Sequence, residues 1–197
     1  PPPRKEVQLR APLFEQGEKK LTPAEIGTVH HLFMQFCDFD AACAPNGVEN
    51  ELNRLAEKKI LSTEQAHAVD KRKIERFFAS DLYKTFMAEN KVRREFKFSV
   101  LVPAQAYFPV AADAPEENVL LQGVIDCLIE TRDGFVILDF KTDRIKKGGA
   151  VERVEQYRPQ LAAYARAVHE IYGRPVRACV LYFFHTGDTE WVSLDED

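Results

Sequence analysis

Two aspartates and a lysine stand where the sequence otherwise predicts buried β-strands. Asp126 lies in one apolar run, and Asp139 and Lys141 lie in the next. Asp133-Gly134 between the runs is a strong signal for a tight hairpin turn, because both residue types tolerate a positive φ. Side chains alternate between the two faces of a strand, so a two-residue turn points all three charged groups to one face.

The length of the turn also fixes the pairing of the two strands. We expect Asp126 to lie directly opposite Lys141, and Asp139 to lie opposite Leu128. The anchor carbons of the two aspartates are then roughly 7–8 Å apart or less, which is within reach of a shared cation.

Three charged groups on an otherwise apolar sheet face each need a partner. Carboxylate oxygens suit hard ions such as magnesium or manganese. A lysine beside such an ion can polarise a nucleophilic water or offset charge that develops on a phosphate. The same three residues can instead form a buried salt bridge that only holds the hairpin together. The hairpin by itself leaves both interpretations open.

The composition is that of an ordinary globular domain. The chain has 197 residues, of which 45% are hydrophobic, which is enough for one substantial core. Its net charge of −4 excludes a basic protein that coats nucleic acid over its whole surface. A nucleic-acid site therefore has to be local or built around cations. No apolar run approaches the roughly 20 residues of a membrane span, and no secretory signal is visible. We therefore expect a cytoplasmic protein with no membrane partner.

The cysteines and the first residues add two expectations. The four cysteines are far apart, lack the spacing of a zinc site, and are expected to be reduced and buried: Cys37, Cys43, Cys127 and Cys179. Residues 1–20 are rich in proline and charge and are expected to form a linker or surface arm, followed by one domain over residues 21–197. Because the chain begins with prolines instead of methionine, we expect it to be part of a longer protein.

A helix is predicted from Pro23 to about Asp40, because Thr22 and Glu25 form a capping box around its start. His30 lies on the apolar stripe of this helix, and His31 lies beside it. A histidine in such a position is most often a packed core residue, but a neutral imidazole can also bind a divalent metal.

The remaining pattern predicts a mixed sheet with helices on its faces. Helices are expected over residues 49–60, 62–79, 80–90 and 151–172, and strands over residues 91–102, 176–184 and 190–194. Gln160 and Tyr164 are neighbours on one surface of the last helix, where both can reach a phosphate or an active-site water. Basic residues gather in segments 71–76 and 141–158, which suit either a solvated surface or a phosphate backbone.

Four motifs in order resemble the RecB-type branch of the PD-(D/E)xK nuclease superfamily. They are Gly27-Thr28-x-x-His31, Gly123-x-x-Asp126, Asp139-x-Lys141-Thr142 and Gln160-x-x-x-Tyr164. Together with Tyr182-Phe-Phe, they look like the C-terminal nuclease domain of the AddA subunits of bacterial AddAB helicase–nucleases. The resemblance covers roughly residues 20–190. It implies a restriction-endonuclease-like α/β fold, with a mixed central sheet flanked by helices and a helical N-terminal part.

The resemblance also implies a role for each motif residue. His31, Asp126, Asp139 and the backbone carbonyl of Phe140 would bind the metal, which would be Mg²⁺ with Mn²⁺ as a possible substitute. Lys141 would be the catalytic lysine. Asp126 and Asp139 would take part in catalysis through the metal, and Gln160 and Tyr164 would act near the DNA.

The implied activity is that of a metal-dependent, exonuclease-type deoxyribonuclease domain. Such a domain belongs to an ATP-dependent helicase–nuclease that acts in double-strand break repair and recombination. Its partners would be a single DNA strand, the upstream helicase domain of the same chain and an AddB-type subunit. One alternative is a non-catalytic DNA-binding or subunit-docking module with the same fold. Another is a CRISPR-associated exonuclease. The sequence lacks the cysteines that would bind an iron–sulfur cluster, which argues against this alternative.

Overall fold

The structure, a computed structural model, describes residues 21–104 and 118–194, so the expected arm over residues 1–20 lies outside the described residues. The N-terminal part is helical: α1 (Pro23–Phe36), α2 (Phe39–Ala42), α3 (Gly47–Glu57), α4 (Thr63–Ala68), α5 (Lys71–Ala79) and the π-helix η2 (Leu82–Met87). The strands and the last helix follow: β1 (Lys91–Pro103), β2 (Asn118–Thr131), β3 (Gly134–Lys141), α6 (Ala150–Tyr172), β4 (Val176–Phe183) and β5 (Asp188–Val192).

The five strands form one mixed sheet, as predicted, and their order in it is β1-β2-β3-β4-β5. The central pair β3 and β4 is parallel, and every other pair is antiparallel. Helix α6 makes the crossover that a parallel pair requires. Because β3 is buried on both faces, it reads as an almost continuous apolar run, and a charged residue within it stands out.

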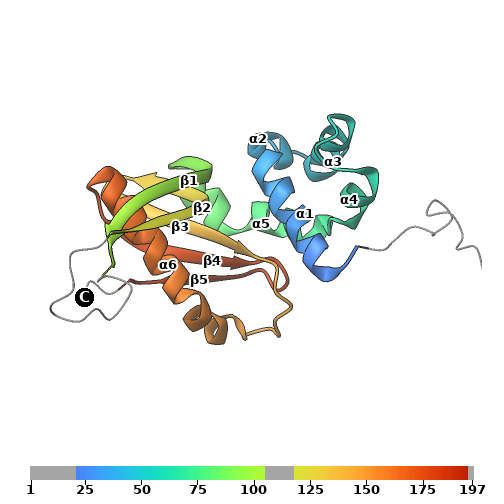
Figure 1. Cartoon of the computed structure of the whole chain (residues 1–197). Coiled ribbons are helices and arrows are strands. Elements are labelled where there is room, and N and C mark those ends of the chain that lie inside the picture. Colours follow the sequence, from blue (N-terminus) through green and yellow to red (C-terminus); the bar gives the residue numbers. More distant parts are fainter. Residues whose placement is uncertain (1–20, 105–117, 195–197) are drawn as a thin grey trace, which may run out of the picture.

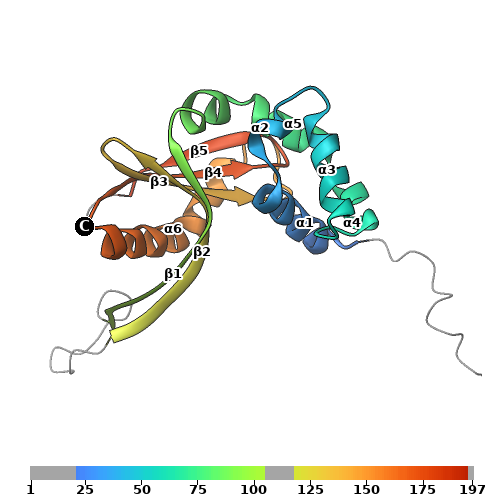
Figure 2. The same cartoon turned by 90° about the horizontal axis from the view of Figure 1, so that it is seen from above.

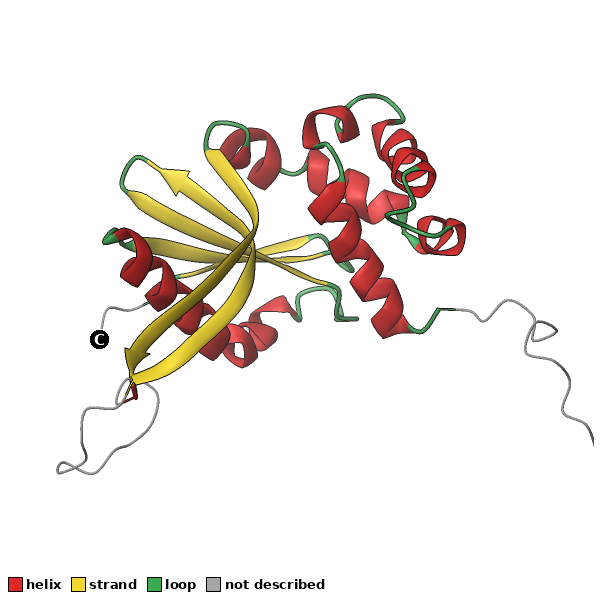
Figure 3. Ribbon diagram, turned by 45° about the horizontal axis from the view of Figure 1, so that its top comes forward, coloured by secondary structure: helices red, strands yellow, loops and turns green. Residues whose placement is uncertain are grey.

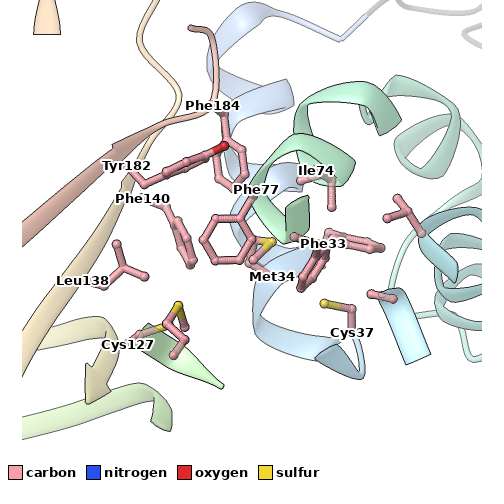
Figure 4. Close-up of a cluster of buried hydrophobic side chains, with 14 of the residues drawn as sticks. Phe33, Met34, Cys37, Ile74, Phe77, Cys127, Leu138, Phe140, Tyr182 and Phe184 are labelled. Carbon is pink, nitrogen blue, oxygen red and sulfur yellow. The ribbon is translucent and has the colours of Figure 1, made fainter. Parts of the chain in front are cut away.

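Helices cover both faces of the sheet (Figure 1). Helix α6 lies against one face, and α1 and α5 pack against the other, with α3 behind them (Figure 2). On the second face Phe77 of α5 lies between Phe140, Tyr182 and Phe184, at centroid distances of 5.1, 5.0 and 6.2 Å (Figure 4). Each such aromatic pair adds about 0.5–1.5 kcal/mol beyond the area it buries. The helical part is therefore joined to the sheet by a single aromatic core.

The hairpin of β1 and β2 extends beyond the rest of the sheet (Figure 3). Strand β2 pairs with β3 only from Cys127 to Thr131, whereas it pairs with β1 along nearly its whole length.

At Glu95 the alternation of side chains along strand β1 is interrupted, so positions that pointed to one face of the sheet before it point to the other face after it. Val92 packs against the core on the α1 side, but Phe96, four residues later, packs against the core on the α6 side. Strict alternation would keep these two side chains on one face. Glu95 has a φ of +49°, an uncommon conformation for a residue with a side chain, and it is the point at which the strand turns over.

Strand β2 makes the same exchange directly opposite. Ile125 belongs to the core under α6, and Cys127 belongs to the core under α1. Asp126 lies between them, so it stands at the position where the two-stranded ribbon turns. Period-two alternation alone cannot predict where the carboxylate of such a residue points.

The register between β2 and β3 differs by two residues from the predicted one. Leu128 pairs with Ile137 and does not lie opposite Asp139. Asp126 accordingly stands opposite Asp139, one step past the end of the paired ladder, and not opposite Lys141. A shift of two residues preserves the faces of a strand, so Asp139 and Lys141 still share the face that was predicted.

The reason for the shift is the place of Gly134. The turn consists of Arg132 and Asp133, and Gly134 is already a strand residue paired with Thr131. A side chain at Gly134 would come within 2.2 Å of the carbonyl oxygen of Pro175. Close approach of the segment between α6 and β4 therefore accounts for this glycine.

The predicted helix over residues 62–79 is two helices, and this expectation was wrong. Val69 adopts an extended conformation and is buried in the core, and Asp70 precedes α5. The first helix ends at Phe36 and not near Asp40, because the Asp38 side chain accepts hydrogen bonds from Asp40 N and Ala41 N and starts the short α2.

Three of the four cysteines are buried, as expected, but Cys43 is exposed at the end of α2. That expectation was wrong because α2 has only one turn and the chain leaves the core directly after it. Within residues 21–104 and 118–194, none of the helices combines the length and the apolar character that crossing a membrane requires.

Candidate active site

The end of β3 and the middle of α6 form a chain of polar contacts. The Lys141 ammonium forms an ion pair with the Oδ2 atom of Asp139, two residues earlier on the same strand face. The same ammonium donates to Oε1 of Gln160 at 3.2 Å. Gln160 Nε2 in turn donates to the hydroxyl oxygen of Tyr164 at 2.8 Å. Four of the predicted site residues thus form one connected group.

A second group joins α1 to the turning point of β2. Oδ2 of Asp126 accepts a hydrogen bond from Phe140 N at 2.7 Å, and its Oδ1 lies 3.4 Å from Nδ1 of His31. The two groups meet because Asp126 and Asp139 stand opposite each other on neighbouring strands. The structure therefore brings together every side chain that the motifs predicted for the site.

The electrostatics of the site reflect two crowded carboxylates. Burial is the largest cause that raises the pKa of Asp139; Lys141 opposes it, the nearby charge of Asp126 adds to it, and the net value is about 6. Burial disfavours a charged His31, but its hydrogen bond to Asp126 and the two aspartate charges raise the pKa of His31 above its ordinary value. Two acids that depend on positive neighbours are typical of a cation site.

The two adjacent histidines have different surroundings. His30 is 3% exposed; its Nδ1 donates to the carbonyl oxygen of Ile26 at 2.8 Å, and its ring packs near Phe184. Burial lowers the pKa of His30, which keeps it neutral. Of the two histidines, His31 is the one that lies beside Asp126, and its role as a metal ligand stays a prediction.

Gly27 sets the distance between α1 and the end of β3. A Cβ at this position would lie 2.7 Å from Oγ1 of Thr142, the residue after Lys141. The glycine of the first motif and the threonine of the third are therefore in contact. This contact holds α1 close enough for His31 to reach Asp126.

Gly123 plays a similar part on the other side of the site. A Cβ there would lie 2.6 Å from the ring of Phe98 and 3.1 Å from that of Tyr164. The two rings pack edge to face with centroids 5.6 Å apart. The second motif needs its glycine because the ring of Phe98, its partner on β1, lies over this position, with the ring of Tyr164 beside it.

Sequence reasoning missed Glu95. It lines a small pocket together with His31, Asp126 and Phe140, and burial and the charge of Asp126 raise its pKa. A third carboxylate therefore stands beside the predicted pair. Its signal in the sequence is slight: it is one of the polar residues that alternate with phenylalanines in the β1 segment.

The basic segments 71–76 and 141–158 were expected to form either a solvated surface or a contact to a phosphate backbone. Some of their side chains pair within the protein, and others are exposed. Arg153 and Arg158 donate to Gln156 and Glu155, neighbours on α6. Arg144, Lys146 and Lys147 are exposed on the segment that leads from the site into α6. On α5, Lys71 pairs with Glu49, Lys73 pairs with Asp70, and Arg76 donates to the carbonyl oxygen of Thr186.

The donor set fits a hard divalent ion in its chemistry. Carboxylates and one imidazole, held by three different elements, face one another. In the described parts of the chain, however, no three His, Cys, Asp or Glu side chains are grouped closely enough to hold a metal. Lys141 engages the Oδ2 atom of the Asp139 carboxylate, so the ammonium and a metal would share this side chain.

Comparison with known proteins agrees with this geometry. Residues 4–193 match the model of the PD-(D/E)XK nuclease superfamily. The chain is 41% identical over 176 residues to an ATP-dependent helicase/nuclease subunit of Desulforamulus reducens, covering 89% of this chain and 14% of that protein. It is 41% identical over 188 residues to the protein of the same name from Moorella thermoacetica, covering 94% and 13%.

A relative from Clostridium botulinum, also with this name, is 37% identical over 183 residues, covering 91% of this chain and 14% of that protein. The chain thus spans about a seventh of the length of these relatives. Because the superfamily model covers nearly the whole chain, including every motif at the site, the chain belongs to the PD-(D/E)XK nuclease superfamily.

Proposed function

We propose that this domain is a magnesium-dependent deoxyribonuclease that hydrolyses phosphodiester bonds from a strand end. The observation that supports it most is that His31, on the distant helix α1, meets Asp126 and the Asp139–Lys141 pair of the β2–β3 hairpin. A salt bridge that served folding alone would not need the imidazole from α1.

His31, Asp126 and Asp139 would hold the metal, together with the carbonyl oxygen of Phe140. Mg²⁺, or Mn²⁺ in its place, would supply Lewis-acid activation of the phosphate and of the attacking water. The hydrogen bond from Phe140 N fixes one oxygen of Asp126 and leaves the other directed toward His31. Asp126 is therefore held in place by the backbone, and Asp139 would be shared between Lys141 and the metal.

Lys141 would offset the negative charge that develops on the phosphate or orient the attacking water. Gln160 accepts from its ammonium and is itself held by Tyr164, so α6 directs the lysine. Gln160 is exposed, which suits a residue next to a DNA strand.

The names of the relatives suggest the setting. The domain would belong to a cytoplasmic ATP-dependent helicase–nuclease that processes double-strand breaks for repair and recombination. The helicase part of the same chain would supply a single DNA strand, and an AddB-type subunit would complete the complex.

The test uses the purified chain, a labelled single-stranded oligonucleotide and Mg²⁺. We expect Lys141→Ala to lower the cleavage rate by at least about 10²-fold, with the unfolding midpoint and the dissociation constant for DNA nearly unchanged. Lys58→Ala, a lysine at the end of α3 away from the site, is the matched control and should cleave like the wild type. Equal rates for wild type and Lys141→Ala, or cleavage by the wild type in EDTA, would refute the mechanism. A wild type that binds DNA but never cuts with any divalent ion would be a binding or docking module.

A further inference from the structure

We propose that Tyr157 is a positioning residue for Lys141, so that the catalytic apparatus on α6 begins one turn before Gln160. The inference rests on the proposed nuclease function. Tyr157 is not one of the motif residues, and in the sequence it stands out only as part of the apolar side of a helix.

The first observation is the placement of the ring. The Lys141 ammonium lies 3.9 Å from the centroid of the Tyr157 ring, which is close for a cation over an aromatic face. The lysine side chain is mostly buried, and a desolvated cation–π contact is stronger than an exposed one. The ring therefore forms part of the small set of groups that surround the ammonium.

The second observation is that the ring itself is held. The Tyr157 hydroxyl donates to Oδ2 of Asp143 at 2.6 Å. Asp143 follows Lys141 by two residues, so the tyrosine contacts the catalytic segment at two points. Thr142, between those points, packs against Gly27 of α1. Residues 141–143 thus contact α6 on one side and α1 on the other.

The third observation concerns the other neighbours of the ammonium. Among the residues that the structure describes, it contacts Asp139, Gln160 and the Tyr157 ring. Asp139 would also serve the metal, and Gln160 is exposed and carries no charge. The electron-rich face of Tyr157 is therefore the neighbour whose attraction for the ammonium would not be shared with a metal.

Three variants separate the ring from the hydroxyl. Tyr157→Leu removes the aromatic face, Tyr157→Phe keeps it without the bond to Asp143, and Asp143→Asn keeps the ring while weakening its anchor. We expect Tyr157→Leu to lower kcat about 5- to 30-fold, the range of one desolvated cation–π contact, with KM for DNA nearly unchanged. Tyr157→Phe and Asp143→Asn both keep the ring and should stay within about threefold of the wild type.

Tyr172→Leu is the matched control. Tyr172 lies on the same helix and has its own cation, the Arg93 guanidinium at 5.3 Å from its ring, but it is far from the catalytic lysine along α6. This variant should lower the unfolding midpoint and leave kcat unchanged. A Tyr157→Leu variant that behaves like this control would overturn the proposal.

A second readout does not depend on cleavage. An ammonium over a ring places the Cε protons of Lys141 in its shielding region, so their NMR signals, assigned with Lys141→Arg, should lie upfield of free lysine. The shift should persist in Tyr157→Phe and vanish in Tyr157→Leu; signals at the free-lysine position in the wild type would overturn the proposal. An inactive wild type with the shift present would refute the nuclease function and leave the positioning contact established. If Tyr157→Leu does not fold, the upfield shift of the Lys141 signals in the wild type and in Tyr157→Phe decides.

Discussion

At the scale of single residues, the site is a compromise between stability and chemistry. Asp139 is 5% exposed and faces a second carboxylate, so its charged form is unfavourable in the folded chain. A buried carboxyl with a raised pKa is typical of binding and catalytic sites. The cost should be visible in the pH dependence of unfolding.

Asp139→Asn tests this cost. The folded state raises the pKa of this carboxyl from its ordinary 3.8 to about 6, so the unfolded chain releases the proton at a lower pH than the folded chain. Stability attached to this group is therefore complete below the ordinary pKa and is lost as the pH rises through the folded value. In EDTA we expect the wild type to lose up to about 3 kcal/mol relative to Asp139→Asn by pH 7.

Urea titrations of both proteins from pH 4 to pH 7 measure the difference. Asp139→Asn should also abolish cleavage, since it removes a metal ligand of the proposed site. A difference in unfolding free energy that stays constant with pH would show that Asp139 is charged at an ordinary pKa. The comparison depends on the two proteins sharing every other titrating group.

The affinity for Mg²⁺ should also depend on the protonation of Asp139. Protons and Mg²⁺ compete for Asp139, so the affinity for Mg²⁺ should increase as the pH rises from about 5 to 7. Calorimetric titration at several pH values measures this. An affinity independent of pH across that window would argue against Asp139 as a ligand.

At the scale of elements, the site depends on where a helix and a strand touch. Gly27 and Thr142 hold α1 against the end of β3, and this contact sets the reach of His31. An alanine in the interior of a helix normally gains about 1 kcal/mol over glycine. At Gly27 that gain competes with a Cβ placed 2.7 Å from Thr142 Oγ1, and overpacking typically costs about 1–3 kcal/mol.

We therefore expect Gly27→Ala to lose both stability and Mg²⁺ affinity. Thr142→Ala in the same chain should remove the clash and let the helix propensity of alanine show, so the double variant should be more stable than Thr142→Ala alone. Thermal unfolding of the four proteins forms the cycle. A Gly27→Ala protein as stable and active as the wild type would show that the contact is not needed.

The sequence predicted the elements well where one local rule dominates. The capping box of Thr22 and Glu25 marked the first residue of α1, and Gly173, with a φ of +63°, ends α6 as expected. The motifs predicted side chains that the structure places next to one another. The mixed sheet followed from the order of the patterns.

The rest could not be predicted because it depends on distant parts of the chain. Gly134 was interpreted as a turn residue, but its backbone is fixed by Pro175 from the segment after α6. The face exchange at Glu95 and Asp126 has no counterpart in a period-two pattern. The role of Tyr157 depends on a loop that brings Asp143 back against α6.

At the scale of the whole molecule, the sheet separates two cores. One lies under α6 and the other joins the sheet to α1, α3 and α5. Without the helical part, Phe140, Tyr182 and Phe184 would be exposed together on one sheet face (Figure 4). The helical part therefore serves both the fold and, through His31, the site.

A fragment that begins at Lys91 tests this view. We expect it to bind the dye ANS and to show no cooperative thermal transition, because an aromatic sheet face without cover does not form a stable fold. The full chain is the control. A fragment with a sharp transition would show that the strands and α6 are an independent unit.

The turn of the β1–β2 ribbon has one more consequence, which concerns how copies of the protein meet. Strand β1 is one of the two edge strands of the sheet, and a long straight edge strand invites pairing with a neighbouring molecule. A strand that turns over at Glu95 cannot offer such an edge along its whole length. The conformation that brings Glu95 to the pocket beside Asp126 thus also interrupts the edge of β1 on which another copy could pair.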